Sequence, residues 1–136
     1  MIFIDANIFM YAAGKPSPEQ KPCQKFLEGL LRPTSREKYC INSEVLQEIL
    51  HRYIAINKRE VAFNCFDSIQ ILDLAILPIG NEELLRARRL LEDYPKLTTR
   101  DAIHIACMEV NQITQVATYD LDFEIVPWVK RVKFIS

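Results

Sequence analysis

The sequence has no strong excess of charge of either sign. Its 17 lysines and arginines and 18 aspartates and glutamates leave a formal net charge of −1 at pH 7. A protein that holds nucleic acid through its overall charge would be more basic. Any contact with RNA or DNA is therefore expected to come from a local surface, not from the charge of the whole chain.

The sequence also lacks paired cysteines and long hydrophobic runs. Its four cysteines lie far apart and form no C-x-x-C pair: Cys23, Cys40, Cys65 and Cys107. We therefore predict free, buried thiols, and neither a zinc site nor a disulfide framework. No apolar run approaches the length of a membrane span, and no signal peptide precedes the first predicted strand. These absences predict a cytoplasmic protein with no membrane partner.

Repeats and low-complexity tracts are absent as well. The 136 residues, 49% of them hydrophobic and 26% charged, have the size and composition of one soluble globular domain with a real core. We predict a single domain over residues 1–136.

Short apolar segments alternate with helical patterns along the chain. Strands are predicted at residues 1–4, 39–41, 69–79, 116–118 and 132–135. Helices are predicted between them, at residues 8–13, 17–31, 44–56, 58–67, 81–93 and 98–110, with Asn57 as the cap of the fourth. This alternation predicts an α/β fold, a three-layer α/β/α sandwich with a mostly parallel sheet of four to five strands. Such sheets bind ligands outside the carboxyl ends of their strands.

Acidic residues fall at that predicted binding edge. Asp5 follows the first strand and Asp120 follows the strand at 116–118. Glu48 lies one turn into the helix after the second strand, and Asp101 opens the helix that leads into the fourth. Four carboxylates in one cleft repel one another, but a divalent cation would make them tolerable. Oxygen ligands suit Mg²⁺ or Mn²⁺, ions that can support phosphodiester cleavage by water.

The helix that carries Asp101 is unusual because apolar residues surround it almost completely. A helix that is apolar on all sides is a buried one, and an unpaired charge at its head would be costly. Thr98 and Asp101 also match the capping-box pattern [ST]-x-x-[DE]. Capping of the helix and binding of a metal ion therefore both remain open as roles of Asp101.

Each of the other acids has a simple explanation when it is considered alone. Asp5 could cap the first helix, and Glu48 could be a solvated residue at the edge of an apolar stripe. Asp120 or Asp122 could each be a turn residue. Their joint placement favours the metal site. We prefer Asp120 to Asp122 as a ligand, because residues two apart in an extended strand point to opposite sides.

Neutral polar residues lie beside these acids. Asn7 and Thr118 are predicted to orient a carboxylate or a water bound to the metal. His104 is one of only two histidines, and no second histidine lies near it in the sequence. We therefore predict that His104 is a hydrogen-bonded buried histidine and not a metal ligand.

Four segments that contain these residues resemble, in order, the motifs of the PIN-domain family, and within it the VapC-like toxins of toxin–antitoxin pairs. The segments are residues 4–11 (IDANIFMY), 43–48 (SEVLQE), 100–106 (RDAIHIA) and 118–123 (TYDLDF). No single motif is specific, but the four in this order and spacing are. The resemblance runs from residue 1 to about residue 123, nearly the whole chain.

The resemblance implies a single PIN-like nuclease domain that hydrolyses RNA phosphodiester bonds as a metal-dependent endoribonuclease. It implies an RNA substrate, a Mg²⁺ or Mn²⁺ cofactor, a homodimer, and an antitoxin that blocks the active cleft. The implied catalytic residues are Asp5, Glu48, Asp101 and Asp120. The implied metal ligands are Asp5, Asp101, Asp120 and Asp122.

Two other functions are compatible with an acidic α/β domain. A receiver-like phospho-acceptor domain would need two adjacent acids after the first strand and an aspartate at the end of the third. Here Asp5 stands alone and the third predicted strand ends near Pro78, which argues against this function. A catalytically silent PIN-like module that binds RNA or protein is the other alternative, and the presence of all four acids argues against it.

Overall fold

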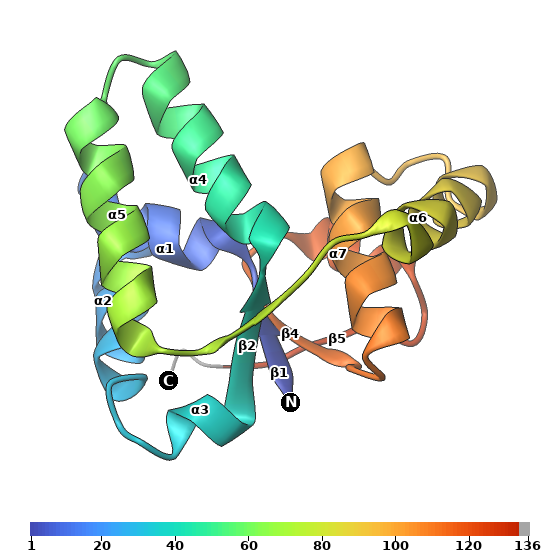
Figure 1. Cartoon of the computed structure of the whole chain (residues 1–136), viewed down its shortest axis with the longest axis horizontal. Helices are drawn as coiled ribbons and strands as arrows, with labels where there is room; N and C mark the ends of the chain where they lie inside the picture. The colour runs from blue at the N-terminus through green and yellow to red at the C-terminus, as the bar shows by residue number, and fades with distance from the viewer. Residues whose placement is uncertain (134–136) are drawn as a thin grey trace.

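The computed structural model describes residues 1–133 and contains a five-stranded sheet in which every neighbouring pair is parallel (Figure 1). The strands follow the spatial order β3-β2-β1-β4-β5. Their bounds are Ile2–Ile4 for β1, Tyr39–Asn42 for β2, Ala75–Leu77 for β3, Gln115–Ala117 for β4 and Lys130–Arg131 for β5.

Helices connect the strands and cover both sides of the sheet. They are α1 (Ala6–Ala13), α2 (Gln20–Gly29), α3 (Ser35–Lys38), α4 (Ser43–Ala55), α5 (Arg59–Leu72), α6 (Asn81–Asp93), α7 (Thr99–Val110) and the short 3-10 helix η1 (Leu121–Ile125). In Figure 1, α1, α2, α4 and α5 lie on one side, and α6 packs with α7 on the other. The predicted three-layer α/β/α sandwich with a parallel sheet is therefore confirmed.

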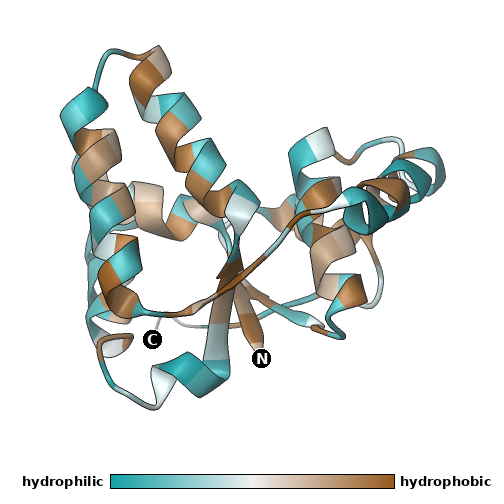
Figure 2. Ribbon diagram, viewed as in Figure 1, coloured by the Kyte–Doolittle hydropathy of each residue, from teal (hydrophilic) through white to brown (hydrophobic). Residues whose placement is uncertain are grey.

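The core lies between the central strands and the inner faces of the helices. Phe3 and Ile4 of β1 are fully buried, because a central parallel strand has both faces covered. Helix α7 buries Ala102, Ile105 and Met108, as its apolar surface predicted. Figure 2 shows hydrophobic residues along the central strands and mostly hydrophilic residues on α6. All four cysteines are free and buried, which confirms that prediction.

The predicted third strand and the helix before it differ from the structure. Helix α5 continues to Leu72, and β3 is only Ala75–Leu77. The buried side chain of Ile69 faces the core from a helix, and an apolar run alone does not separate that arrangement from a buried strand. Asn57 does not cap α5; its φ of 59° places it in the left-handed region, where asparagine is tolerated, between α4 and α5.

The last strand begins earlier than predicted. β5 pairs with β4 over Lys130 and Arg131, and the Val132 N–H continues the contact by donating to the Val116 carbonyl at 2.9 Å. Residues 134 and 135 of the predicted strand lie outside the described residues. The edge position of this strand agrees with the prediction. Among residues 1–133, no helix is both long enough and apolar enough to cross a membrane.

Candidate active site

The parallel strand order brings the predicted acids to one edge of the sheet. The backbone N–H of Asp5 donates to the Ala117 carbonyl at 3.0 Å, so β1 and β4 end side by side. Asn42 ends β2 and accepts a hydrogen bond from the Val45 N–H at 3.0 Å, which caps α4. The ends of β1 and β4 and the first two turns of α4 and α7 carry the two clusters of side chains described next.

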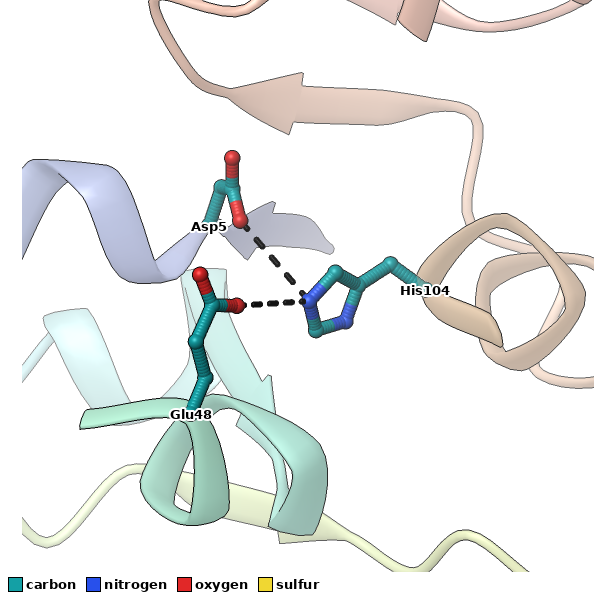
Figure 3. Close-up of side chains that lie close together, drawn as sticks. All are labelled: Asp5, Glu48 and His104. Atoms are coloured by element: carbon teal, nitrogen blue, oxygen red, sulfur yellow. Dashed lines mark ion pairs between the residues drawn. The ribbon is translucent and has the colours of Figure 1, made fainter. Parts of the chain in front are cut away.

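The first group, which we call the inner cluster, consists of Asp5, Glu48 and His104, and all three side chains are buried (Figure 3). The Nε2 atom of His104 lies 3.8 Å from Oδ1 of Asp5 and 3.7 Å from Oε1 of Glu48. Figure 3 shows that the three residues come from different segments and point toward one another. The inner cluster therefore joins β1, α4 and α7.

Hydrogen bonds fix the carboxylate of Asp5. Its Oδ1 accepts from the Ala6 N–H at 2.8 Å, and its Oδ2 accepts from the Thr118 hydroxyl at 2.8 Å. The Asn7 amide donates to the Thr118 hydroxyl oxygen at 3.0 Å. Asp5 therefore caps α1 and faces the inner cluster at the same time. Thr118 contacts this carboxylate directly, and Asn7 contacts Thr118.

The two acids of the inner cluster have opposite pKa shifts. Burial raises the pKa of Asp5, and its contacts with His104 and Thr118 only partly oppose that effect. Oε1 of Glu48 lies 3.8 Å from Nε of Arg100, and its Oε2 lies 3.6 Å from Nη1 of Arg52. Burial alone would raise the pKa of Glu48, but the contacts with His104 and the arginines outweigh burial and lower it. Glu48 is therefore a buried, charged residue and not a solvated one.

The second group, which we call the outer cluster, consists of Asp101, Asp120 and Asp122, with one carboxylate oxygen from each within 4.8 Å of the others. Asp101 is 8% exposed, and its pKa rises to about 8 because of burial and the neighbouring carboxyls of Asp120 and Asp5. Within residues 1–133, no lysine or arginine forms an ion pair with these three acids. A bound cation would therefore supply positive charge that the side chains around these acids do not.

Both aspartates after β4 reach the outer cluster. The strand ends at Ala117, and the N–H of Asp120 donates to the Thr118 hydroxyl oxygen at 3.0 Å. Oδ1 of Asp120 then accepts from the Asp122 N–H at 2.9 Å, which starts η1. The assumption of an extended strand in this segment is wrong, because the chain turns at Asp120. The geometric reason to prefer Asp120 to Asp122 therefore disappears.

The sequence identified His104 as a buried histidine but not as a neighbour of the acids. Its Nδ1 pairs with the Asn42 amide nitrogen at 3.0 Å, which confirms the predicted hydrogen bond. Its position three residues after Asp101 was the available signal, since residues three apart share one face of a helix. The sequence did not identify Arg100 as a neighbour of the acids either. Its Nε lies 3.2 Å from Oε1 of Glu44 and also forms an ion pair with Glu48.

The donor set at this edge fits a small divalent cation. The outer cluster offers three carboxylates, and Asp5 adds a fourth carboxylate that acts electrostatically on Asp101. Hard oxygen donors of this kind suit Mg²⁺ or Mn²⁺.

A family model described as PIN domain matches residues 2–129. The chain belongs to the PIN-domain family.

This PIN domain is similar over its whole length to Ribonuclease VapC13 of Mycobacterium tuberculosis. The two are 39% identical over 132 residues, which cover 97% of this chain and 99% of the relative.

Solved structures with the same fold include Mycobacterium tuberculosis VapC20, a sarcin-ricin loop cleaving toxin, with a TM-score of 0.77, 14% identity and coverage of 96% of this chain and 98% of that one. VapBC2 from Rickettsia felis, bound to a DNA fragment from its promoter, has a TM-score of 0.69, 20% identity and coverage of 97% and 98%. The fold of the PIN domain agrees with these neighbours, and the receiver-like alternative is not favoured.

Proposed function

We propose that this PIN domain is an endoribonuclease that hydrolyses RNA phosphodiester bonds with the help of Mg²⁺ or Mn²⁺. The outer cluster is the observation that carries this proposal, because its three adjacent carboxylates form no ion pair with a lysine or arginine within residues 1–133, and a cation would offset their mutual repulsion. RNA is the proposed substrate because the relative at 39% identity is named a ribonuclease.

In this proposal Asp5, Asp101, Asp120 and Asp122 would hold the cation. A bound Mg²⁺ or Mn²⁺ would lower the pKa of water and stabilise negative charge on the phosphate. Thr118 and Asn7 hold the Asp5 carboxylate in one orientation. Glu48, whose pKa is lowered by its contacts with His104, Arg100 and Arg52, would accept a proton from the attacking water at a carboxylate oxygen.

The experiment that tests this proposal is RNA cleavage by the purified protein, freed of any bound partner. We expect cleavage of single-stranded or loop RNA with Mn²⁺ or Mg²⁺, and no cleavage in EDTA. Asp120→Asn should lower cleavage by at least about 10-fold, whereas Asp93→Asn, at an exposed position at the end of α6, should not change it. Cleavage that persists in EDTA would refute the metal mechanism, and RNA binding without cleavage would favour the silent binding module.

An antitoxin is the proposed protein partner, because one solved structure with the same fold, at a TM-score of 0.65, is a toxin–antitoxin complex from Klebsiella pneumoniae. The structure offers an apolar groove of about 600 Å³ lined by residues of α1, α2 and α5, including Phe9, Leu27 and Leu72. Leu31 and Ile71 on its rim are 64% and 73% exposed, and exposed apolar patches of this kind mark interaction sites. We propose that a helix of the antitoxin covers this groove.

Co-expression with the protein encoded by the adjacent reading frame tests this partner. We expect the two proteins to co-purify and cleavage to be inhibited, and Ile71→Lys to weaken that inhibition without changing cleavage by the free protein.

We also propose that the free protein is a homodimer. Its molar mass in sedimentation equilibrium distinguishes a dimer from a monomer.

A further inference from the structure

His104 is a fully buried polar side chain with an incomplete set of hydrogen bonds. Its Nε2 atom has no hydrogen-bond partner within the described residues, although the side chain is 0% exposed. Most buried polar atoms in proteins are paired, so an unpaired one needs an explanation. The two nearest carboxylate oxygens, on Asp5 and Glu48, are slightly too far away for ordinary hydrogen bonds.

Asn42 determines which nitrogen of His104 carries the proton. The Asn42 side-chain oxygen accepts from the Val45 N–H at 3.0 Å, because this oxygen caps α4. The other side-chain atom of Asn42, its NH₂ group, therefore faces Nδ1 of His104 at 3.0 Å. An NH₂ group only donates, so Nδ1 must accept and carries no proton. The proton of the neutral ring is then on Nε2.

This tautomer decides what His104 can do at the acid site. The ligand atoms of Asp5, Glu48 and His104 lie within 4.8 Å of one another, a spacing that would also suit a metal ion. A nitrogen that carries a proton has no lone pair for a metal ion. The N–H of Nε2 instead points between the two carboxylates (Figure 3).

We infer that His104 is a positioning residue: the Nε2–H of its neutral ring lies between the carboxylates of Asp5 and Glu48, attracts both electrostatically and so holds them in place for the cation site. This inference rests on the proposed nuclease function. Asp5 and Glu48 repel each other, and a donor placed between them offsets part of that repulsion. The ring has little freedom to turn away, since it packs 5.1 Å from the Phe3 ring and 6.4 Å from the Phe123 ring.

The tautomer itself can be measured without any metal or RNA. Long-range ¹H–¹⁵N NMR correlations of the full-length protein, labelled with ¹⁵N-histidine and kept in EDTA, report which ring nitrogen is protonated. We expect His104 to carry its proton on Nε2 alone, with the exposed His51 as an internal reference. A proton on Nδ1 would overturn the inference, whether or not the protein cleaves RNA.

Two substitutions separate a positioning role from a purely structural one. The amide nitrogen of glutamine can reach the place of Nε2, whereas the shorter amide of asparagine reaches only the place of Nδ1. We expect His104→Asn to weaken Mn²⁺ binding, measured by calorimetry without RNA, and kcat by about 10–100-fold each, because residues that orient ligands have effects of this size. His104→Gln should stay within a few-fold of the unchanged protein, and KM for RNA should change little in either variant.

The matched control is His51→Asn, the same substitution at the exposed histidine of α4. It should change neither Mn²⁺ affinity nor kcat. Equal losses in His104→Gln and His104→Asn, in proteins that keep the circular dichroism spectrum of the unchanged chain, would overturn the positioning role. If the unchanged protein has the predicted tautomer but neither binds Mn²⁺ nor cleaves RNA, the proposed function fails and the positioning role fails with it.

Discussion

All three residues of the inner cluster are buried, whereas the outer cluster runs from the buried Asp101 to the exposed Asp122, and the charges of the two clusters are balanced in different ways. Glu48 of the inner cluster has Arg52, Arg100 and His104 around it, and its pKa is lowered. Asp101 of the outer cluster has mainly other carboxyls around it, and its pKa rises to about 8. Burial opposes the charge of both acids, so the difference comes from their neighbours.

This difference suggests a division of tasks within one site. The inner cluster is held by protein groups and keeps its geometry before any ion arrives. Among the described residues, no lysine or arginine pairs with the outer cluster, so a bound cation would add the positive charge and couple the stability of this cluster to metal binding. Asp5 links the two clusters, since it contacts His104 and its charge acts on Asp101.

The largest effect is expected from removing one charge of the outer cluster. Asp101→Asn keeps an oxygen acceptor but loses the charge, so we expect a loss of cleavage of at least about 100-fold at saturating Mn²⁺, beyond the effect of residues that only orient ligands. Cleavage rates of Asp101→Asn and of the control Asp93→Asn measure this. If Asp101→Asn is active but less stable, Asp101 is a capping residue and the four-acid site is wrong.

Asp120 and Asp122 should have effects of similar size to each other. Both contribute an oxygen to the outer cluster, because the chain turns at Asp120. We expect each substitution to asparagine to lower cleavage by at least about 10-fold, the lower end for residues around a metal. Rates and Mn²⁺ affinities of the two variants make the comparison. An unchanged rate for Asp122→Asn would restore the preference for Asp120.

A smaller effect is expected from the support of Asp5. Thr118→Val keeps the shape of the side chain but removes the hydroxyl that donates to Asp5 and accepts from Asp120. We expect cleavage to fall by about 10-fold, as for other groups that orient ligands. Thr99→Val, at an exposed position in the first turn of α7, serves as the control. Equal cleavage by the two variants would remove the orienting role of Thr118.

The sequence predicted the acid edge because it depends on local order: Asp5 and Asp120 follow strands, and Asp101 and Glu48 lie in the first two turns of helices. It did not predict the contacts that distinguish the two clusters. Asn42 and His104 are 62 residues apart, so their hydrogen bond depends on how α7 packs beside β2. The turn at Asp120 was missed because alternating residues after a strand are compatible with both an extended chain and a 3-10 helix. Ile69 was misassigned because the apolar pattern of a buried helix end matches that of a strand.

The smallest and most specific effect is the dependence of stability on pH without metal. In the unfolded chain Asp101 has an ordinary pKa near 3.8, whereas in the folded protein the pKa is about 8. Between these values the folded state binds more protons, so the free energy of unfolding falls as pH rises toward 8 and is highest at the acidic end. The raised pKa of Asp5 acts in the same direction.

Asp101→Asn removes this contribution. In EDTA, we expect Tm of the unchanged protein to fall by several degrees more than Tm of Asp101→Asn between pH 5 and pH 8, because one proton difference between the folded and unfolded states corresponds to about 1.4 kcal/mol per pH unit. Calorimetry of both proteins and of Asp93→Asn measures the difference. Mn²⁺ should reverse the trend in the unchanged protein, because its ligands bind the ion only when they are deprotonated. Parallel curves of Tm against pH for all three proteins in EDTA would mean that repulsion between the carboxylates of the outer cluster does not lower the stability of the folded protein.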